Sequence, residues 1–345
     1  MAYLRNAWYL AAWSSEVRAG ELFQRRLLDE PLVLYRLSDG TPVALQDRCP
    51  HRFAPLHMGK IVDDGVQCPY HGLQFSASGT CVANPHGPVP GAARVRSYPV
   101  AERYSAIWAW MGDPAQATPD SITPFEFLSP EHWYVGTGYL RINAHYELET
   151  DNILDLSHIE FLHPLFASEA VRAAKVQSLQ EGDTVWSKRF ISRDTPPDFI
   201  YTGFNIPRGE LVDRWLDVRW NAPANMVLNV GGVISGQPRE KGVQLQQAHV
   251  FTPESATTTH YFYAVSFPRA MGPHAEQLAR QSVETLRGPF ESEDKPIVEA
   301  IARNMGTQSF WDLKPLLLSI DGASVLARRI LAKKIDAEQS DQPPA

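Results

Sequence analysis

The 345-residue chain contains only three cysteines, too few for a framework of disulfide bonds. It has no apolar run approaching the roughly 20 residues that a membrane-spanning helix needs, and its first residues show no signal-peptide pattern. Lysine and arginine never occur in runs longer than two, so no basic stretch suited to nucleic acid is present. We therefore expect a cytoplasmic protein whose partners include neither a membrane nor nucleic acid.

Two of the three cysteines stand next to histidines. The first pair reads Cys49-x-His51, and the second reads Cys68-x-x-His71. Structural zinc sites with this donor set usually take both cysteines from one knuckle and both histidines from a helix. Here each loop supplies one of each, which favours a Rieske 2Fe-2S cluster, with both thiolates on one iron and both imidazoles on the other. A zinc-stabilised binding module is the alternative, and it would be colourless. Cys81 is left over and is expected to be a buried strand residue.

The chain is expected to form an α+β protein of two domains. Residues 1–115 are rich in strand-like runs and turns, such as the hairpin turn at Asp39-Gly40, and predict a small antiparallel β domain. A stretch rich in proline, alanine and threonine follows. Residues 116–345 contain alternating, β-branched and aromatic runs that suit one large antiparallel sheet, together with helices near the end of the chain.

A predicted helix from about residue 146 to residue 162 carries polar residues in an apolar context. Asp151, Asp155 and His158 are spaced i, i+4 and i+7, which places them on one stripe of an ideal helix. Burying aspartate is costly unless it is paired or binds a metal. A solvated surface helix is the alternative for this segment taken alone.

A second histidine, His163, follows His158 by five residues, or about 140° around an ideal helix. The two rings can face one metal only if the helix bulges or ends between them, and Pro164 favours an ending. Two histidines in this arrangement are two sides of a facial triad for non-haem Fe(II), which needs one further carboxylate.

These motifs together resemble the Rieske non-haem iron oxygenases. The resemblance rests on the two Cys-His loops followed by Asn152-x-x-Asp155-x-x-His158-x4-His163. Three further segments narrow it to the vanillate O-demethylase oxygenase group, which includes dicamba O-demethylase and toluenesulfonate methyl-monooxygenase; they are Leu4-Arg5-Asn6-Ala7-Trp8-Tyr9, Asp213-Arg214-Trp215 and Glu293-Asp294. The resemblance implies an N-terminal Rieske domain, a C-terminal domain with a helix-flanked antiparallel sheet, and a head-to-tail homotrimer.

The resemblance also implies roles for single residues. It places the third iron ligand at Asp294. Spacing alone leaves Glu291 and Glu293 open as alternative ligands, and it also leaves open that Asp294 only caps a helix. The resemblance implies that Asp155 links the cluster ligand His71 of one subunit to an iron histidine of the next. Asn152 is expected beside the iron without binding it.

The implied enzyme takes electrons from an NAD(P)H-dependent reductase, possibly through a ferredoxin, and uses O2 to hydroxylate an aromatic substrate. Attack on an aryl methoxy group of an aromatic acid would release formaldehyde. The alternatives are hydroxylation of a methyl group or a ring carbon, and, from another class, a Rieske electron-transfer protein without the second iron. Asn229 and His249, polar residues inside apolar runs, are candidates for substrate binding or equally for structural roles, and His260 is a weaker candidate.

Overall fold

The computed structural model describes residues 2–164 and 168–340. The chain divides into two compact units, Met1–Pro124 with Thr252–Ala256, and Phe125–Phe251 with Thr257–Ala345. The first is built of strands and the second of strands and helices, which confirms the predicted α+β class. The predicted limit of the first domain at residue 115 stays a prediction. No helix in the described residues is long and apolar enough to span a bilayer.

The first unit consists of antiparallel sheets. Within the described residues these have the orders β1-β11-β10, β2-β3-β4-β9 and β5-β6-β7-β8. The strands are β1 (Trp8–Trp13), β2 (Phe23–Leu27), β3 (Glu30–Arg36), β4 (Pro42–Gln46), β5 (Lys60–Val62), β6 (Gly65–Gln67), β7 (Gln74–Phe75), β8 (Cys81–Ala83), β9 (Ser97–Tyr98), β10 (Val100–Arg103) and β11 (Ala106–Trp110). Short helical turns are η1 (Leu56–Met58), η2 (Pro114–Gln116) and η3 (Pro119–Ser121). Gly40 turns the predicted β3–β4 hairpin with φ of +89°, a conformation in which glycine has no steric penalty. Cys81 is buried in β8, as expected.

The second unit is built on a seven-stranded antiparallel sheet. Its order is β12-β18-β17-β16-β15-β14-β13. The strands are β12 (Trp133–Ile142), β13 (Lys175–Glu181), β14 (Thr184–Asp194), β15 (Val212–Asn221), β16 (Asn225–Ile234), β17 (Val243–Ser255) and β18 (Thr258–Pro268). These strands contain the predicted strand-like runs, whose aromatic and β-branched residues favour a pleated, half-buried surface.

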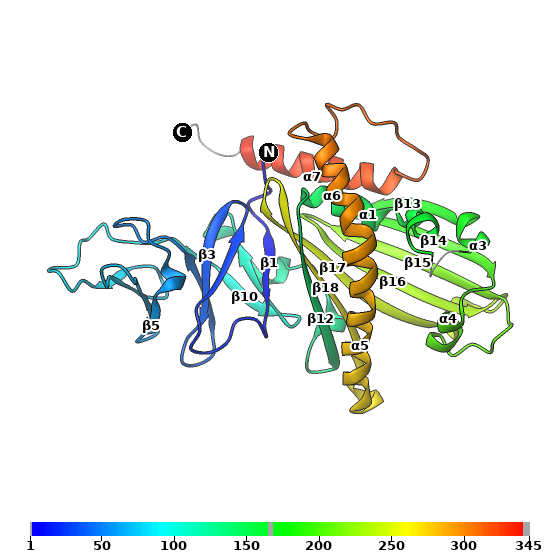
Figure 1. The fold of residues 1–345 in the computed structure, drawn as a ribbon, viewed down its shortest axis with the longest axis horizontal. Coiled ribbons are helices and arrows are strands. Elements are labelled where there is room, and N and C mark those ends of the chain that lie inside the picture. Colours follow the sequence, from blue (N-terminus) through cyan, green and yellow to red (C-terminus); the bar gives the residue numbers. More distant parts are fainter. Residues whose placement is uncertain (1, 165–167, 341–345) are drawn as a thin grey trace. The chain divides into compact units, whose positions relative to one another are not determined.

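Helices cover one face of this sheet. They are α1 (Tyr146–Leu154), α2 (Ile159–Leu162), α3 (Glu169–Arg172), α4 (Asp198–Gly203), α5 (His274–Pro289), α6 (Lys295–Met305) and α7 (Gly322–Ser340), and the π-helical turn η8 (Phe290–Asp294) joins α5 to α6. The unit also contains the short turns η4 (Glu126–Leu128), η5 (Leu156–His158), η6 (Arg239–Lys241) and η7 (Arg269–Met271). Helix α5 packs along β12 and β18 (Figure 1). Gly136 permits the approach, because a Cβ there would lie 2.2 Å from the carbonyl oxygen of Ala279.

Candidate active site

The predicted helix over residues 146–162 is interrupted in the structure, as convergence of His158 and His163 on one metal requires. Helix α1 ends at Leu154, and Asp155 has φ of −114° and ψ of 93°. Its carboxylate accepts a hydrogen bond from the backbone N–H of Ser157 at 3.0 Å and so caps the turn η5. The expectation of one helix through residue 162 is therefore wrong. The i, i+4, i+7 stripe from Asp151 through His158 is broken too, because a side chain that caps the next turn interrupts the 3.6-residue period.

His158 and His163 stand on either side of the short helix α2. His163 has left helical geometry, with φ of −118° and ψ of 77°, as expected for a residue before Pro164. The helix thus ends between the two rings, which is the condition under which both can turn toward one point. Their centroids lie 5.2 Å apart.

Asp294 comes from the junction of two long helices. Helix α5 continues through the π-helical turn η8 into α6 without leaving helical backbone angles. A π turn inserts a residue into the helix and re-aims the side chains beside it, and such turns are frequent at functional sites. The carboxylate of Asp294 is buried and makes no hydrogen bond as a helix cap. The capping alternative for Asp294 is therefore not what the structure contains.

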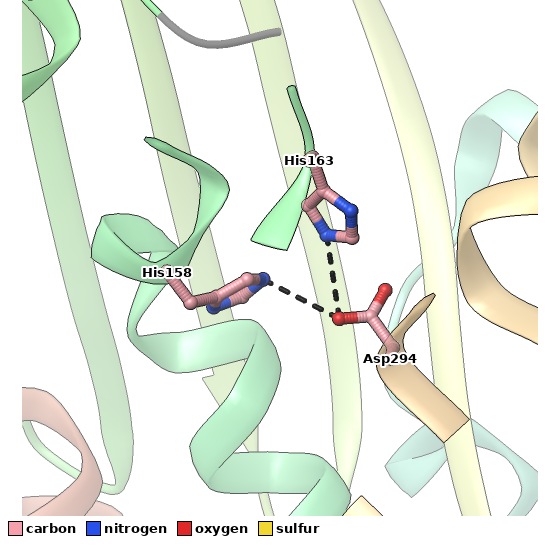
Figure 2. A group of neighbouring side chains, drawn as sticks. All are labelled: His158, His163 and Asp294. Carbon is pink, nitrogen blue, oxygen red and sulfur yellow. Dashed lines mark ion pairs between the residues drawn. The ribbon is translucent and has the colours of Figure 1, made fainter. Parts of the chain in front are cut away.

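These three side chains converge (Figure 2). The Nε2 atom of His158 lies 3.5 Å from Oδ1 of Asp294, and the Nε2 atom of His163 lies 3.3 Å from the same oxygen. One potential ligand atom from each residue falls within 4.8 Å of the others. Two imidazoles and one carboxylate that leave other directions open form the donor set of a facial-triad iron site.

Hydrogen bonds behind the rings determine which nitrogen faces the centre. Nδ1 of His158 lies 2.7 Å from the carbonyl oxygen of Asp155, and Nδ1 of His163 lies 2.5 Å from a carboxylate oxygen of Glu293. Both partners are acceptors, so each Nδ1 donates and each Nε2 carries a lone pair. Two lone pairs and a carboxylate oxygen at these distances repel one another unless a cation lies between them. The residues therefore fit an iron ion.

The amide of Asn152 supports the same centre. Its Nδ2 donates to Oδ1 of Asp294 at 3.1 Å, so Asn152 orients the carboxylate from α1. Asp151, in contrast, forms a hydrogen-bonded ion pair with Arg328 of α7 and has no place among the three converging residues. Burial raises the pKa of Glu149, also on α1, to about 8.

A cavity of about 140 Å³ adjoins the triad. Its wall is mainly apolar, formed by Ile153, Leu156, Ile159, Val171, Ile200, Leu216, Leu228, Val230, Leu286, Pro289 and Phe290. Apart from the triad, its polar lining residues are Arg214, Gln247 and His249. An apolar cavity with a few polar groups is typical of a small-molecule site.

Of the two predicted substrate residues, only His249 lines this cavity. Asn229 stands between Leu228 and Val230 on β16, and those two neighbours face the cavity. Because side chains alternate along a strand, Asn229 points to the opposite face, where its amide donates to Gln244. The expectation for Asn229 is therefore not met. His260 bonds Tyr139 instead of lining the cavity.

His249 is held by a buried tyrosine. Its Nδ1 lies 2.7 Å from the hydroxyl of Tyr261, and its Nε2 is buried without a hydrogen-bond partner among the described residues. Burial lowers the pKa of His249 to about 4 although Asp294 opposes the shift, and burial raises the pKa of Tyr261 well above its usual value. The ring is therefore neutral. If the Tyr261 hydroxyl donates to Nδ1, Nε2 carries the proton.

The four predicted cluster residues belong to the first unit. Cys49 and Cys68 are buried thiols without a disulfide. Burial and the neighbouring thiol of Cys68 raise the pKa of Cys49 to about 11, so a cation is needed to hold both as thiolates. The rings of His51 and His71 lie 4.6 Å apart, and Nδ1 of His71 is buried without a partner among the described residues. A cluster iron would satisfy that nitrogen.

Two functional contacts were missed at the level of sequence. Glu293 behind His163 was considered only as an alternative ligand, and no basic residue was placed in the pocket, although Arg214 lines it. The alternation along β15 was visible in the sequence. Which of its two faces meets the helices was not, because that depends on the packing of distant elements.

Known proteins show the same organisation. Residues 7–99 match the Rieske [2Fe-2S] domain, and residues 142–337 match the vanillate O-demethylase oxygenase C-terminal domain. The chain is 39% identical to the oxygenase component of chloroacetanilide N-alkylformylase from Rhizorhabdus wittichii, over 97% of each chain. It is 37% identical to the oxygenase component of dicamba O-demethylase from Stenotrophomonas maltophilia, over 96% of this chain and 98% of that protein.

The fold agrees as well. A crystal structure of dicamba monooxygenase bound to dicamba superposes with a TM-score of 0.87 at 34% identity, over 99% of this chain and 100% of that one. Another, with non-heme iron and dicamba, gives 0.81 at 33% identity over the same shares. The predicted cofactors, a Rieske 2Fe-2S cluster and a mononuclear iron, are thereby confirmed. The chain belongs to the Rieske non-haem iron oxygenases of the vanillate O-demethylase type and is the oxygenase component of a monooxygenase.

Proposed function

We propose that this oxygenase demethylates a methoxylated aromatic acid, giving a phenol and formaldehyde. The observation that carries the proposal is the opening of the triad of His158, His163 and Asp294 onto a mainly apolar cavity. The relatives named for dicamba and vanillate O-demethylation support the same reaction type. The balance is ArOCH3 + O2 + 2 e⁻ + 2 H⁺ giving ArOH + HCHO + H2O.

The bound iron supplies the oxidising power for inserting one oxygen atom into a methyl C–H bond, after which the hemiacetal collapses. The protein contributes position. Apolar wall residues such as Leu216, Leu228 and Phe290 exclude water and hold an aromatic ring beside the triad. Asn152 keeps the carboxylate of Asp294 in place while the substrate is bound.

His249 orients the substrate in this proposal. With the hydroxyl of Tyr261 donating to Nδ1, the neutral ring presents an N–H group at Nε2 to the cavity. Such a group donates to an ether or phenol oxygen and so directs the methoxy carbon toward the triad. It does not bring a second charge next to Asp294.

Electrons come from a separate reductase, as for other oxygenase components of Rieske systems. We assign Cys49, His51, Cys68 and His71 as the cluster ligands and His158, His163 and Asp294 as the iron ligands. In the proposed homotrimer, His71 of one subunit delivers the electron through Asp155 of the next. The capped turn supports this role, because it fixes the Asp155 carboxylate one turn before His158.

The proposal is tested with the purified oxygenase, a Rieske-type reductase and NADH. A panel of methoxybenzoates is expected to give formaldehyde and the matching phenol in equal amounts, with one of each per NADH oxidised. The control is Asp294→Ala, which should keep the visible absorption of the cluster and lose formaldehyde. A fully metal-loaded enzyme that hydroxylates methyl-aryl sulfonates but forms no formaldehyde from any methoxy compound would overturn it.

A further inference from the structure

Strand β14 contains a bulge beside the cavity wall. Its pairing with β15 shifts register between Ile191 and Asp194, and Arg193 within the bulge has φ of +52°. The carboxylate of Asp213 fastens this bulge by accepting from the backbone N–H of Arg193 at 2.8 Å and from the hydroxyl of Ser235 at 2.9 Å. Bulges of this kind re-aim the side chains that follow them.

The side chain that this bulge re-aims is Asp194. In an unbroken strand, Ile191 and Asp194 would face opposite sides, but the extra residue puts Asp194 opposite Val212, two residues before Arg214. The Nη2 atom of Arg214 lies 2.5 Å from Oδ2 of Asp194, and the two residues are 5% and 1% exposed. By fixing the bulge, Asp213 places Asp194 where it forms a buried ion pair with Arg214, on the face of the sheet that lines the cavity.

Arg214 reaches the cavity with hydrogen-bonding capacity left over. It lines the cavity, and while Nη2 pairs with Asp194, Nε makes no hydrogen bond within the part of the chain that the structure describes. A buried N–H group without an acceptor is costly, and an arginine donor gains most from an anionic acceptor. Burial lowers the pKa of Arg214, and the charge of Asp194 opposes that shift.

This arginine marks the end of the cavity remote from His249. Met226 pairs with His249 on one side and with Trp220 on the other, so Trp220 gives the level of His249 on β15. From residue 220 to residue 214 the strand advances about 20 Å. The ring of His249 lies 5.7 Å from that of Phe290, which belongs to the same turn η8 as Asp294, whereas Arg214 pairs with Asp194. The triad and Arg214 therefore stand at opposite ends.

We propose that Arg214 binds the carboxylate of an elongated substrate, an aryl ether whose acid group extends from the ring away from the iron ligands. The inference rests on the proposed demethylase function for the place of the methoxy group. It adds a class of substrate: methoxyphenyl-alkanoic acids are preferred over methoxybenzoates, whose carboxylate sits directly on the ring.

The experiment measures binding of demethylated products, which contain no methyl group to oxidise. Calorimetry with the metal-loaded enzyme compares 3-(4-hydroxyphenyl)propionate, its amide and 4-hydroxybenzoate. Arg214→Met should weaken binding of the propionate by about 10- to 100-fold, the effect of one charge-assisted hydrogen bond, and change the other two less than about threefold. Arg214→Met/Asp194→Asn should show the same pattern without an unpaired buried aspartate.

The matched control is Arg239→Met. Arg239 pairs with Asp217 at 2.6 Å and stacks on Trp215, which lies on the face of β15 opposite Arg214. Binding of all three ligands should be unchanged in it. Equal losses for the acid and the amide, or full binding of the propionate by the folded double variant, would overturn the inference. Failure to detect formaldehyde in the turnover assay would sink the proposed reaction but leave this binding result standing.

Discussion

His163 depends on a residue that stands behind it. Glu293 accepts from Nδ1 at 2.5 Å, which fixes the ring so that Nε2 meets Asp294. His158 has a backbone acceptor for the same purpose, the carbonyl of Asp155. A side-chain acceptor can be removed by substitution and a backbone carbonyl cannot. The two histidines can therefore be tested separately.

Glu293→Ala is expected to lower the affinity for Fe(II) by about 10-fold, the effect typical of losing such a partner. Anaerobic competition with a metal chelator measures it, and the visible absorption of the cluster reports that the first unit is intact. Glu291→Ala, whose carboxylate pairs with exposed Arg287, should leave the affinity unchanged. Unchanged affinity in Glu293→Ala would contradict the role, and complete loss of iron would point to Glu293 as a ligand itself.

Most of the candidate metal ligands could be predicted from the sequence because they lie close together in the chain. Cys49-x-His51 and Cys68-x-x-His71 lie in short loops, and His158 and His163 are close in the chain. Asp294 is more than a hundred residues away, and only the resemblance singled it out from Glu291 and Glu293. The substrate candidates divided for the same reason: His249 and Asn229 look alike in sequence, but the strand register puts them on opposite faces.

Helix α1 owes its polar residues to two different neighbours. Asn152 donates to Asp294, a proposed iron ligand, whereas Glu147 and Asp151 face α7. Arg328 of α7 is 7% exposed and lies between the two carboxylates, with Nη1 at 2.5 Å from Glu147 and Nη2 at 2.6 Å from Asp151. Helix α7 thus holds α1 in place, and α1 immediately precedes the proposed iron ligands His158 and His163 in the chain.

Arg328→Met should destabilise the second unit by about 3 kcal/mol, because two carboxylates lose their partner in a partly buried site. Burial raises the pKa of both Glu147 and Asp151. Groups with raised pKa values in the folded state are less costly once protonated, so the deficit should shrink as the pH falls toward 5. Urea unfolding at pH 8 and pH 5.5 measures it. Arg329→Met, at an exposed position, is the control, and an equal loss of stability in both variants would contradict a stabilising role for the ion pairs of Arg328.

Across the whole molecule, one unit provides the cluster residues and the other the iron residues. Asp155 is the proposed link between them through the trimer. Its carboxylate oxygen Oδ1 caps the turn η5 and lies 3.7 Å from Nη2 of the buried Arg189. This carboxylate oxygen suits the role of acceptor for the outward N–H of a cluster histidine.

Asp155→Asn is expected to keep both the cluster and the iron and to lose nearly all turnover. Metal analysis and the cluster spectrum measure the first, and formaldehyde release with NADH measures the second. Mixed trimers with a Cys68→Ser chain, which lacks the cluster but keeps Asp155, should regain part of the activity, because the proposed path carries electrons from one chain to the next. Normal coupled turnover in Asp155→Asn, or no recovery in the mixed trimers, would contradict the path.

The sequence by itself determined the redox chemistry, the α+β class and most of the strands. Donor atoms such as Cys49 and His51 and the apolar–polar alternation of strands are properties of short stretches, so they can be read without knowing what packs where. Tertiary structure decided the rest. The break of the helix at Asp155, the π turn before Asp294, the face occupied by Asn229 and the inward turn of Arg214 all follow from packing between distant segments. The sequence therefore identifies the oxidant, and the packing of the sheet against its helices shapes the cavity for the substrate.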